Sequence, residues 1–226
     1  MKIAGHGKGK ILSQEEIQRL FGEGLQTPKD RALFAIMLFT SCRVNEACSL
    51  YKVDVFDSKG RVRPHLLIRK SNTKGKLATR TIPVIEDLRV ILSAYQPSHE
   101  SVYLFPGRFN QGHLHPDSAA RILRKACRRV DIEGASTHSF RRTALTQMSN
   151  AGIPLRVIAD VSGHRVLSQL QAYLEIKPEQ VLGAVSSLSM LSPVREVGKI
   201  AFGDMSTPAS LEELEDSPPG SQGRLS

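Results

Sequence analysis

The chain has 226 residues, 40% of them hydrophobic, which suits one domain with a sizeable core and excludes a disordered chain. No run approaches the roughly 18 consecutive apolar residues of a membrane span, and no apolar segment follows the basic N-terminus, so neither a transmembrane helix nor a secretory signal is expected. The formal net charge of +9 fits a polyanionic partner (DNA, RNA or an acidic membrane surface) or a basic domain without one.

The N-terminal part of the chain contains two helix-start signals. Residues 1–11 are rich in Gly and Lys, and we expect them to be flexible. Ser13, with a glutamate three residues later, forms a capping box that predicts a helix to about Phe21. A cap followed by proline at 27–28 predicts the start of a long apolar helix. A short helix is expected next, around 45–50.

The middle of the chain changes in pattern. Three short segments resemble strands, at 53–56, 66–68 and 79–84, with Gly-containing turns between them. They predict a small antiparallel sheet of two or three strands. Helical periodicity then resumes in six segments: 86–96, 116–130, 138–151, 154–162, 167–175 and 178–187.

These elements predict a mainly α-helical domain with a small antiparallel β-sheet, an α+β fold. After about residue 192 the composition shifts to Ser, Pro, Gly and acidic residues, which predicts a disordered acidic tail over 192–226. The expected organisation is therefore one domain over 12–191 between that tail and the basic segment 1–11. The scattered cysteines lack metal-ligand spacing, and we expect reduced, buried thiols of an intracellular protein at Cys42, Cys48 and Cys127.

One predicted helix, at 116–130, has a basic face. Its exposed side would carry Arg121, Arg124, Lys125 and Arg128. Such a face is commonly solvated surface, and contact with DNA phosphates is the alternative. The sequence leaves this choice open.

Several residues could together cleave a DNA strand without metal or ATP. This chemistry needs a nucleophile, fixed cations around the phosphate and a general acid for the leaving oxygen. Arginine suits the phosphate because its planar fork meets two oxygens and keeps its charge. The candidate arginines are Arg43, with Glu46 at i+3, and Arg141, with His138 three residues before it on a helix that Thr137 could cap.

Two more candidates follow in the chain. His164 comes directly after a glycine, and Tyr173 stands nine residues later. Each pattern alone has a common structural explanation: a helix salt bridge, a chance His-x-x-Arg, a turn or a packed tyrosine. Their combination and order resemble the lambda-integrase-type tyrosine recombinases over roughly residues 12–187.

The resemblance implies a role for each residue. Arg43 and Arg141 would clamp the scissile phosphate, His138 and His164 would hydrogen-bond its oxygens, and Tyr173 would attack to form a 3′-phosphotyrosyl intermediate. Glu46 would hold Arg43, and Arg142 would add a cation near the phosphate. The family also has a lysine on its β-hairpin that acts as general acid. Here this residue would be Lys74. Lys76 is the alternative, because the spacing from Lys74 to Pro83 looks one residue longer than is usual in the family.

The resemblance also implies partners and context. It predicts double-stranded DNA as substrate, no metal or cofactor, and a homotetramer on DNA, with a monomer possible in the absence of DNA. It further predicts a cytoplasmic, nucleoid-associated bacterial protein of a mobile element. Two alternatives remain: a type IB topoisomerase-like relaxing enzyme and a catalytically idle DNA-binding module. Family members usually carry a helical DNA-binding domain ahead of the catalytic one, so the chain is expected to be either a fragment or a short form.

Overall fold

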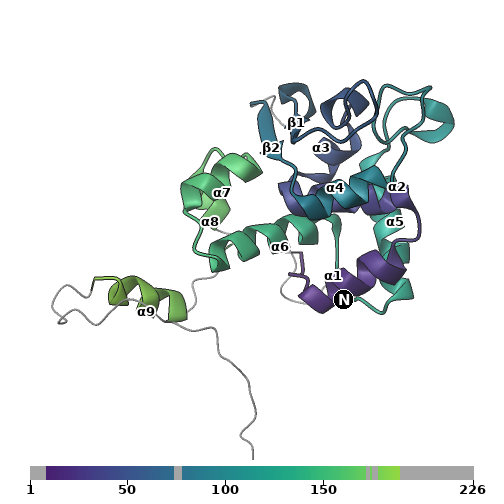
Figure 1. Ribbon diagram of the computed structural model, residues 1–226. Coiled ribbons are helices and arrows are strands. Elements are labelled where there is room, and N and C mark those ends of the chain that lie inside the picture. The colour runs from purple at the N-terminus through teal and green to yellow at the C-terminus, as the bar shows by residue number, and fades with distance from the viewer. Residues whose placement is uncertain (1–8, 74–77, 172–173, 175–177, 189–226) are drawn as a thin grey trace, which may run out of the picture. The chain divides into compact units, whose positions relative to one another are not determined.

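The computed structural model describes residues 9–73, 78–171, 174 and 178–188 (Figure 1). The chain divides into two units, residues 1–181 and 182–226, and the candidate site lies in the first. The helices and strands of this first unit are α1 (Gln14–Arg19), α2 (Pro28–Thr40), α3 (Val44–Cys48), β1 (His65–Ile68), β2 (Arg80–Pro83), α4 (Glu86–Ser93), α5 (Pro116–Arg129), α6 (Thr137–Asn150), α7 (Leu155–Ser162) and α8 (Leu167–Gln171). Helix α9 (Pro178–Ser186) crosses the boundary between the units.

Helix α2 is the centre of the fold. Residues 32–37 of this helix are all buried, and it packs against α3, α4 and α6 (Figure 1). Thr27 caps it by accepting the backbone N–H of Asp30 at 3.1 Å, as the cap-proline pair predicts. The helix ends at Ser41, whose φ of 52° is left-handed and turns the chain into α3. At this turn the Ser41 carbonyl accepts a hydrogen bond from Arg141 of α6.

The capping box at the first helix is also confirmed. The Ser13 hydroxyl accepts the Glu16 N–H at 3.1 Å, and the Glu16 carboxylate accepts the Ser13 N–H at 3.1 Å. The helix α1 continues into a π-helical turn, Leu20–Gly24, that packs on α5. The three cysteines are buried and free, as expected.

The sheet has two antiparallel strands, β1 and β2, paired with Leu66 opposite Ile82 and Ile68 opposite Arg80. The strand expected at 53–56 was wrong. Lys52–Asp54 forms a 3-10 turn instead, and Phe56 makes only an isolated bridge to Val62. The physical reason is Asp54, whose buried carboxylate binds Arg69 and ties the segment to the end of β1.

This ion pair, between a buried Asp54 and an Arg69 side chain that is 44% exposed, yields a stability prediction. Both Asp54 carboxylate oxygens accept Arg69 N–H groups, at 2.7 to 2.9 Å, and the Asp54 side chain is 1% exposed. We expect Asp54→Ala to lower the free energy of unfolding by about 2 to 3 kcal/mol, since three charge-assisted bonds are lost. Glu86→Ala removes an exposed ion pair with Arg89 and should cost about 0.5 kcal/mol. Urea unfolding of both variants measures the difference, and equal losses would contradict the prediction.

A second, smaller cluster of apolar residues lies beside the main core. It joins α6, α7 and α8 through Leu145, Ile158, Ala159 and Leu170, with Leu174 packed against it. The expected helix 178–187 is present as α9, and the expected acidic tail lies outside the described residues. None of the described helices is long and apolar enough to cross a membrane.

Candidate active site

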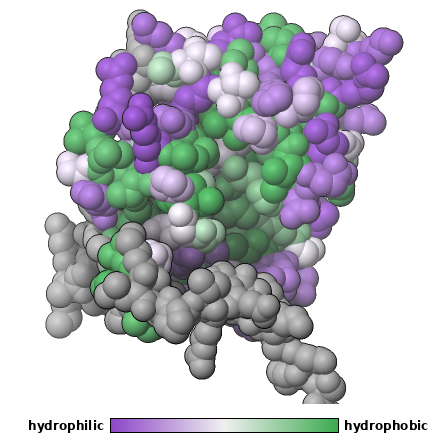
Figure 2. Space-filling view, turned by 60° about the vertical axis from the view of Figure 1, so that its left-hand side comes forward, coloured by the Kyte–Doolittle hydropathy of each residue, from purple (hydrophilic) through white to green (hydrophobic). Residues whose placement is uncertain are grey.

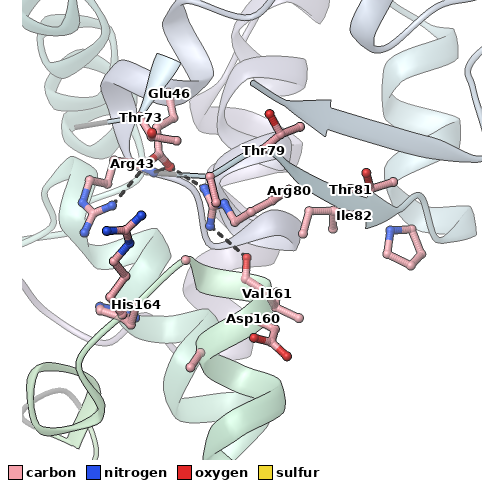
Figure 3. A pocket seen from close by; sticks show the side chains of 15 residues that line it. Arg43, Glu46, Thr73, Thr79, Arg80, Thr81, Ile82, Asp160, Val161 and His164 are labelled. Atoms are coloured by element: carbon pink, nitrogen blue, oxygen red, sulfur yellow. Dashed lines mark hydrogen bonds and ion pairs between the residues drawn. The ribbon is translucent and has the colours of Figure 1, made fainter. Parts of the chain in front are cut away.

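A cleft of about 450 Å³ lies between β2, the start of α3 and the end of α7 (Figure 3). Figure 2 shows the molecule turned so that the α7 side comes forward, with hydrophilic residues around a recess that exposes apolar surface. The polar and charged residues that line the cleft are Arg43, Glu46, Thr73, Thr79, Arg80, Thr81, Asp160, His164 and Arg165. They come from segments far apart in the sequence.

Arg43 reaches the cleft from the tight turn between α2 and α3. It is the residue immediately before α3, and its side chain is 32% exposed. Thr40 stabilises the turn: its hydroxyl donates to the Ile36 carbonyl at 2.7 Å and accepts the Cys42 N–H at 3.3 Å. The local backbone therefore fixes where the Arg43 side chain starts.

Glu46 is the buried carboxylate of the cleft. Its side chain is 2% exposed, and it accepts the Arg43 backbone N–H at 2.9 Å and Arg43 Nη1 at 3.3 Å. The predicted i,i+3 pair is thus present. A shorter bond, 2.7 Å, comes from Nη2 of Arg80.

Arg80 was missed by the sequence analysis. Its side chain is 7% exposed, and besides Glu46 it binds the Val161 carbonyl through Nη1 at 2.9 Å (Figure 3). Strand periodicity could have found it, because Arg80 shares the buried face of β2 with Ile82. A charge at an inward strand position requires a partner, and no single segment of the sequence reveals which one.

Arg141 lies behind the cleft surface and is 2% exposed. It occupies the second turn of α6, where Nη1 donates to the Ser41 carbonyl and Nη2 to the Ser162 carbonyl at 2.9 Å. Nη2 also lies 3.1 Å from Nε2 of His164. Burial, together with the charges of Arg43 and Arg80, lowers the pKa of Arg141 to about 10, which leaves it charged at neutral pH. It therefore joins the ends of α2 and α7.

His164 follows the left-handed Gly163, φ 71°, which ends α7. Its Nδ1 is 2.7 Å from the Ser162 hydroxyl oxygen, and that hydroxyl donates to the Ile158 carbonyl at 2.6 Å. Since the hydroxyl hydrogen is used there, we assign the imidazole proton to Nδ1, with Nε2 accepting from Arg141. Burial first, then the charges of Arg141, Arg43 and Arg80, lowers the pKa of His164 to about 4. The ring is neutral at pH 7.

The depressed pKa of His164 predicts a pH dependence of stability. The unfolded chain protonates this histidine near its ordinary pKa of 6.5, whereas the folded chain does so only near 4. Stability is therefore full above pH 6.5 and falls as the pH drops toward 4, by on the order of 2 kcal/mol once the effect is reduced for solvent screening of this half-buried ring. His164→Asn should flatten this part of the curve, as measured by urea unfolding between pH 4 and 7. Parallel curves for the two proteins would refute the assignment.

The other expected site residues are placed differently. His138 is exposed in the first turn of α6, and Arg142 donates to the Gly9 carbonyl at 2.9 Å, so neither lines the cleft. The cap of α6 is Ser136, not Thr137: its N–H is bonded to the Ser139 hydroxyl at 3.0 Å, and Thr137 is the first helical residue.

Three candidates lie outside the described residues: Lys74, Lys76 and Tyr173. The described residues on either side of the two lysines, Thr73 and Ala78, both line the cleft. Near the tyrosine in the sequence, Leu170 and Leu174 both pack in the smaller apolar cluster with α6 and α7. No group of three His, Cys, Asp or Glu residues that could hold a metal occurs among the described residues.

The expected basic face is present on α5, away from the cleft lining. Its exposed basic residues are Arg121, Arg124, Lys125 and Arg128. Arg121 bonds the Ser118 hydroxyl of its own helix at 2.9 Å. Contact of this face with DNA stays a prediction.

Comparison with known proteins gives a consistent set of relatives. The model of the phage integrase family matches residues 10–180. Tyrosine recombinase XerA of Pyrococcus furiosus is 30% identical over 188 residues, 80% of this chain and 63% of the relative. Tyrosine recombinase XerD of Rhizobium meliloti is 29% identical, over 76% of this chain and 58% of the relative. The chain thus spans about three fifths of the length of these relatives.

Solved structures share the fold. The crystal structure of XerA recombinase superposes with a TM-score of 0.64 at 19% identity, covering 80% of this chain and 65% of the other. The Tn1549 transposon integrase in complex with a circular intermediate DNA gives 0.63 at 15% identity, covering 82% and 67%. At these identities the likeness extends to the fold alone.

Proposed function

The chain belongs to the phage integrase family of tyrosine recombinases, and on that basis we propose that it is the catalytic part of a site-specific DNA recombinase. It cleaves and rejoins strands of double-stranded DNA through a phosphotyrosyl intermediate on Tyr173. The observation that carries the proposal is that Arg43 and His164 line one cleft, with Arg141 directly behind His164.

The charge of the cleft supports binding of a phosphodiester. Arg43 and Arg80 both pair with the buried carboxylate of Glu46, and Arg141 adds a third positive charge behind the cleft surface. The neutral His164 adds a polar ring without repelling the arginines. Fixed cations in a partly buried site stabilise the charge that develops on phosphate oxygens more than they would in water.

The proposed reaction is a transfer of the scissile phosphate from DNA to Tyr173. The Tyr173 oxygen attacks phosphorus, the Tyr O–P bond forms and the P–O5′ bond breaks, in line. The tyrosine proton leaves to a base, a role that the resemblance gives to His138, and Lys74 or Lys76 supplies a proton to the departing 5′ oxygen. Arg43 and Arg141 stabilise the charge on the phosphorane. Attack by a 5′ hydroxyl reverses the step and joins the strand.

Partners and assembly belong to the same proposal. The Tn1549 integrase structure holds a circular intermediate DNA, and we propose double-stranded DNA as the substrate here, with the basic face of α5 as an additional phosphate contact. We propose a homotetramer on DNA and action in the cytoplasm.

A covalent adduct assay tests the function. The protein is mixed with DNA fragments of its source element, without metal, and resolved on a denaturing gel. A protein band of reduced mobility that survives denaturation, and whose mobility increases when nuclease digests the attached DNA, supports the strand-cleavage step. Absence of this band while DNA binding is intact favours the idle DNA-binding module. Products distinguish the other alternative: exchanged partners indicate a recombinase, whereas relaxed supercoils alone indicate a topoisomerase-like enzyme.

A further inference from the structure

Glu46 forms ion pairs of unequal strength with two arginines, Arg80 and Arg43. Its Oε2 lies 2.7 Å from Arg80 Nη2, a normal length for a charge-assisted bond, whereas its Oε1 lies 3.3 Å from Arg43 Nη1. The Arg80 and Glu46 side chains are 7% and 2% exposed, so water screens their attraction weakly. Arg43 is 32% exposed, so its weaker bond is also more screened. Of the two guanidiniums, that of Arg80 therefore holds the carboxylate more strongly, and Oε2 also accepts the Arg43 backbone N–H at 2.9 Å.

We propose that Arg80 is a positioning residue of the phosphate site: by holding Glu46, it keeps that carboxylate from pairing fully with Arg43 and leaves the Arg43 guanidinium available to the DNA phosphate. The proposal deepens the proposed function and rests on it for the identity of the ligand. Without Arg80, the Glu46 carboxylate would have Arg43 as its remaining side-chain partner and would pair with it more closely. A closer pair would occupy N–H groups of Arg43 that the phosphate needs.

The position of Arg80 is itself fixed from two sides. Its Nη1 donates to the Val161 carbonyl at 2.9 Å, at the end of α7 (Figure 3). Gly163 packs directly on the guanidinium, and a Cβ at that residue would lie 2.7 Å from Arg80 Nη1. The strand β2 fixes the base of the side chain, because Arg80 pairs opposite Ile68 on the buried face. Glu46 therefore meets a guanidinium with little freedom to move.

If Arg80 acts by holding Glu46, a second substitution at Glu46 should restore the phosphate affinity that is lost without Arg80. A role of Arg80 in packing alone predicts no such recovery. Arg80→Met removes the guanidinium and should weaken binding of inorganic phosphate about tenfold. Adding Glu46→Gln to that variant removes the carboxylate charge and should return the affinity to within about threefold of wild type. Arg80→Lys keeps a cation beside Glu46 and should also stay within about threefold.

The measurement is a phosphate titration of the full chain at low ionic strength, followed by the imidazole NMR signals of His164. The proposal is overturned if Arg80→Met binds phosphate as wild type does, or if the double variant stays as weak as Arg80→Met. The second result would assign Arg80 a packing role through Val161. Circular dichroism at the titration temperature establishes that each variant is folded.

A glycine pair tests the same idea without removing any charge. Gly163 and Gly152 have nearly equal left-handed φ values, 71° and 72°, so alanine costs similar backbone strain at both. A Cβ at Gly152 meets nothing within 4 Å, whereas at Gly163 it displaces the Arg80 guanidinium. Gly163→Ala should weaken phosphate binding several-fold and Gly152→Ala should not. If Arg80→Met does not fold, this pair decides, and equal affinities overturn the proposal.

The function and the further inference fail separately. Phosphate titration does not require strand cleavage, so the Arg80 proposal is tested even if wild type forms no covalent adduct. If wild type does form the adduct, Arg80→Met should form it more slowly at saturating DNA. An unchanged rate would refute the role of Arg80 and leave the proposed function standing.

Discussion

Tyr173→Phe is expected to form no covalent DNA adduct, a loss on the order of 10⁴-fold or more in cleavage rate, because no other group replaces a missing nucleophile. DNA binding should change little, since a single oxygen is removed. The measurement is a denaturing gel with single-turnover sampling, beside a filter-binding or mobility assay of the same preparation. An adduct that persists in Tyr173→Phe would falsify the assignment.

The chain provides matched controls for this experiment. It contains four tyrosines, and the remaining three lie in the described fold: Tyr51, Tyr95 and Tyr103. Tyr51 and Tyr103 stack on each other with ring centroids 5.2 Å apart. The Tyr95 hydroxyl donates to the Leu104 carbonyl, and burial raises the pKa of Tyr95 to about 12, so it does not supply a phenolate. A phenylalanine at position 103 would keep the stacking on Tyr51, so Tyr103→Phe should form the adduct at the wild-type rate.

The second large effect is expected for Arg43→Ala, with a fall of about 10² to 10³-fold in cleavage rate at saturating DNA. Arg43 lines the cleft and is partly exposed, so its loss should affect chemistry far more than folding. Arg43→Lys should recover only part of the rate, because an ammonium contacts phosphate as a point charge without the planar fork.

The pKa of His164 in the Arg43→Ala variant shows whether the loss of cleavage comes from the missing charge. The charge of Arg43 contributes to the depressed pKa of His164, so removing it should raise that pKa toward its ordinary value. Imidazole NMR across the pH range measures the shift. Arg61→Ala serves as control, since Arg61 pairs with Asp57 on an exposed turn outside the cleft. Equal cleavage rates for the Arg43 and Arg61 variants would exclude Arg43 from the phosphate clamp.

The fold explains why the cleft can hold so much positive charge. Helix α2 is buried along 32–37 and ends at Ser41, whose carbonyl accepts a hydrogen bond from Arg141. At the end of α7, the Ser162 carbonyl accepts a hydrogen bond from Arg141 and the Val161 carbonyl accepts one from Arg80. Carbonyl groups at helix ends carry partial negative charge, so they stabilise buried guanidiniums that would otherwise repel one another. The apolar scaffold thus supplies the partners that the arginines need.

Much of the fold followed from local signals. The caps at Ser13 and Thr27 were predicted correctly because a side chain that bonds the first turn of its own helix needs no distant partner. The strand at 53–56 was predicted wrongly because Asp54 is satisfied by Arg69, fifteen residues away, and pattern reasoning treats an acid as solvent-facing. The cap at Thr137 was off by one residue for a smaller reason, since several adjacent residues can cap.

For the site, the sequence by itself determined which residue types were available and their order, because the arginine, histidine and tyrosine pattern is written along the chain. Only the tertiary structure decided their places. It buried Arg141 behind His164, turned Arg142 toward Gly9 and brought Arg80 onto Glu46. Each of these placements depends on contacts between segments far apart in the sequence, and the low polarity of the interior makes those contacts decisive for a charged group.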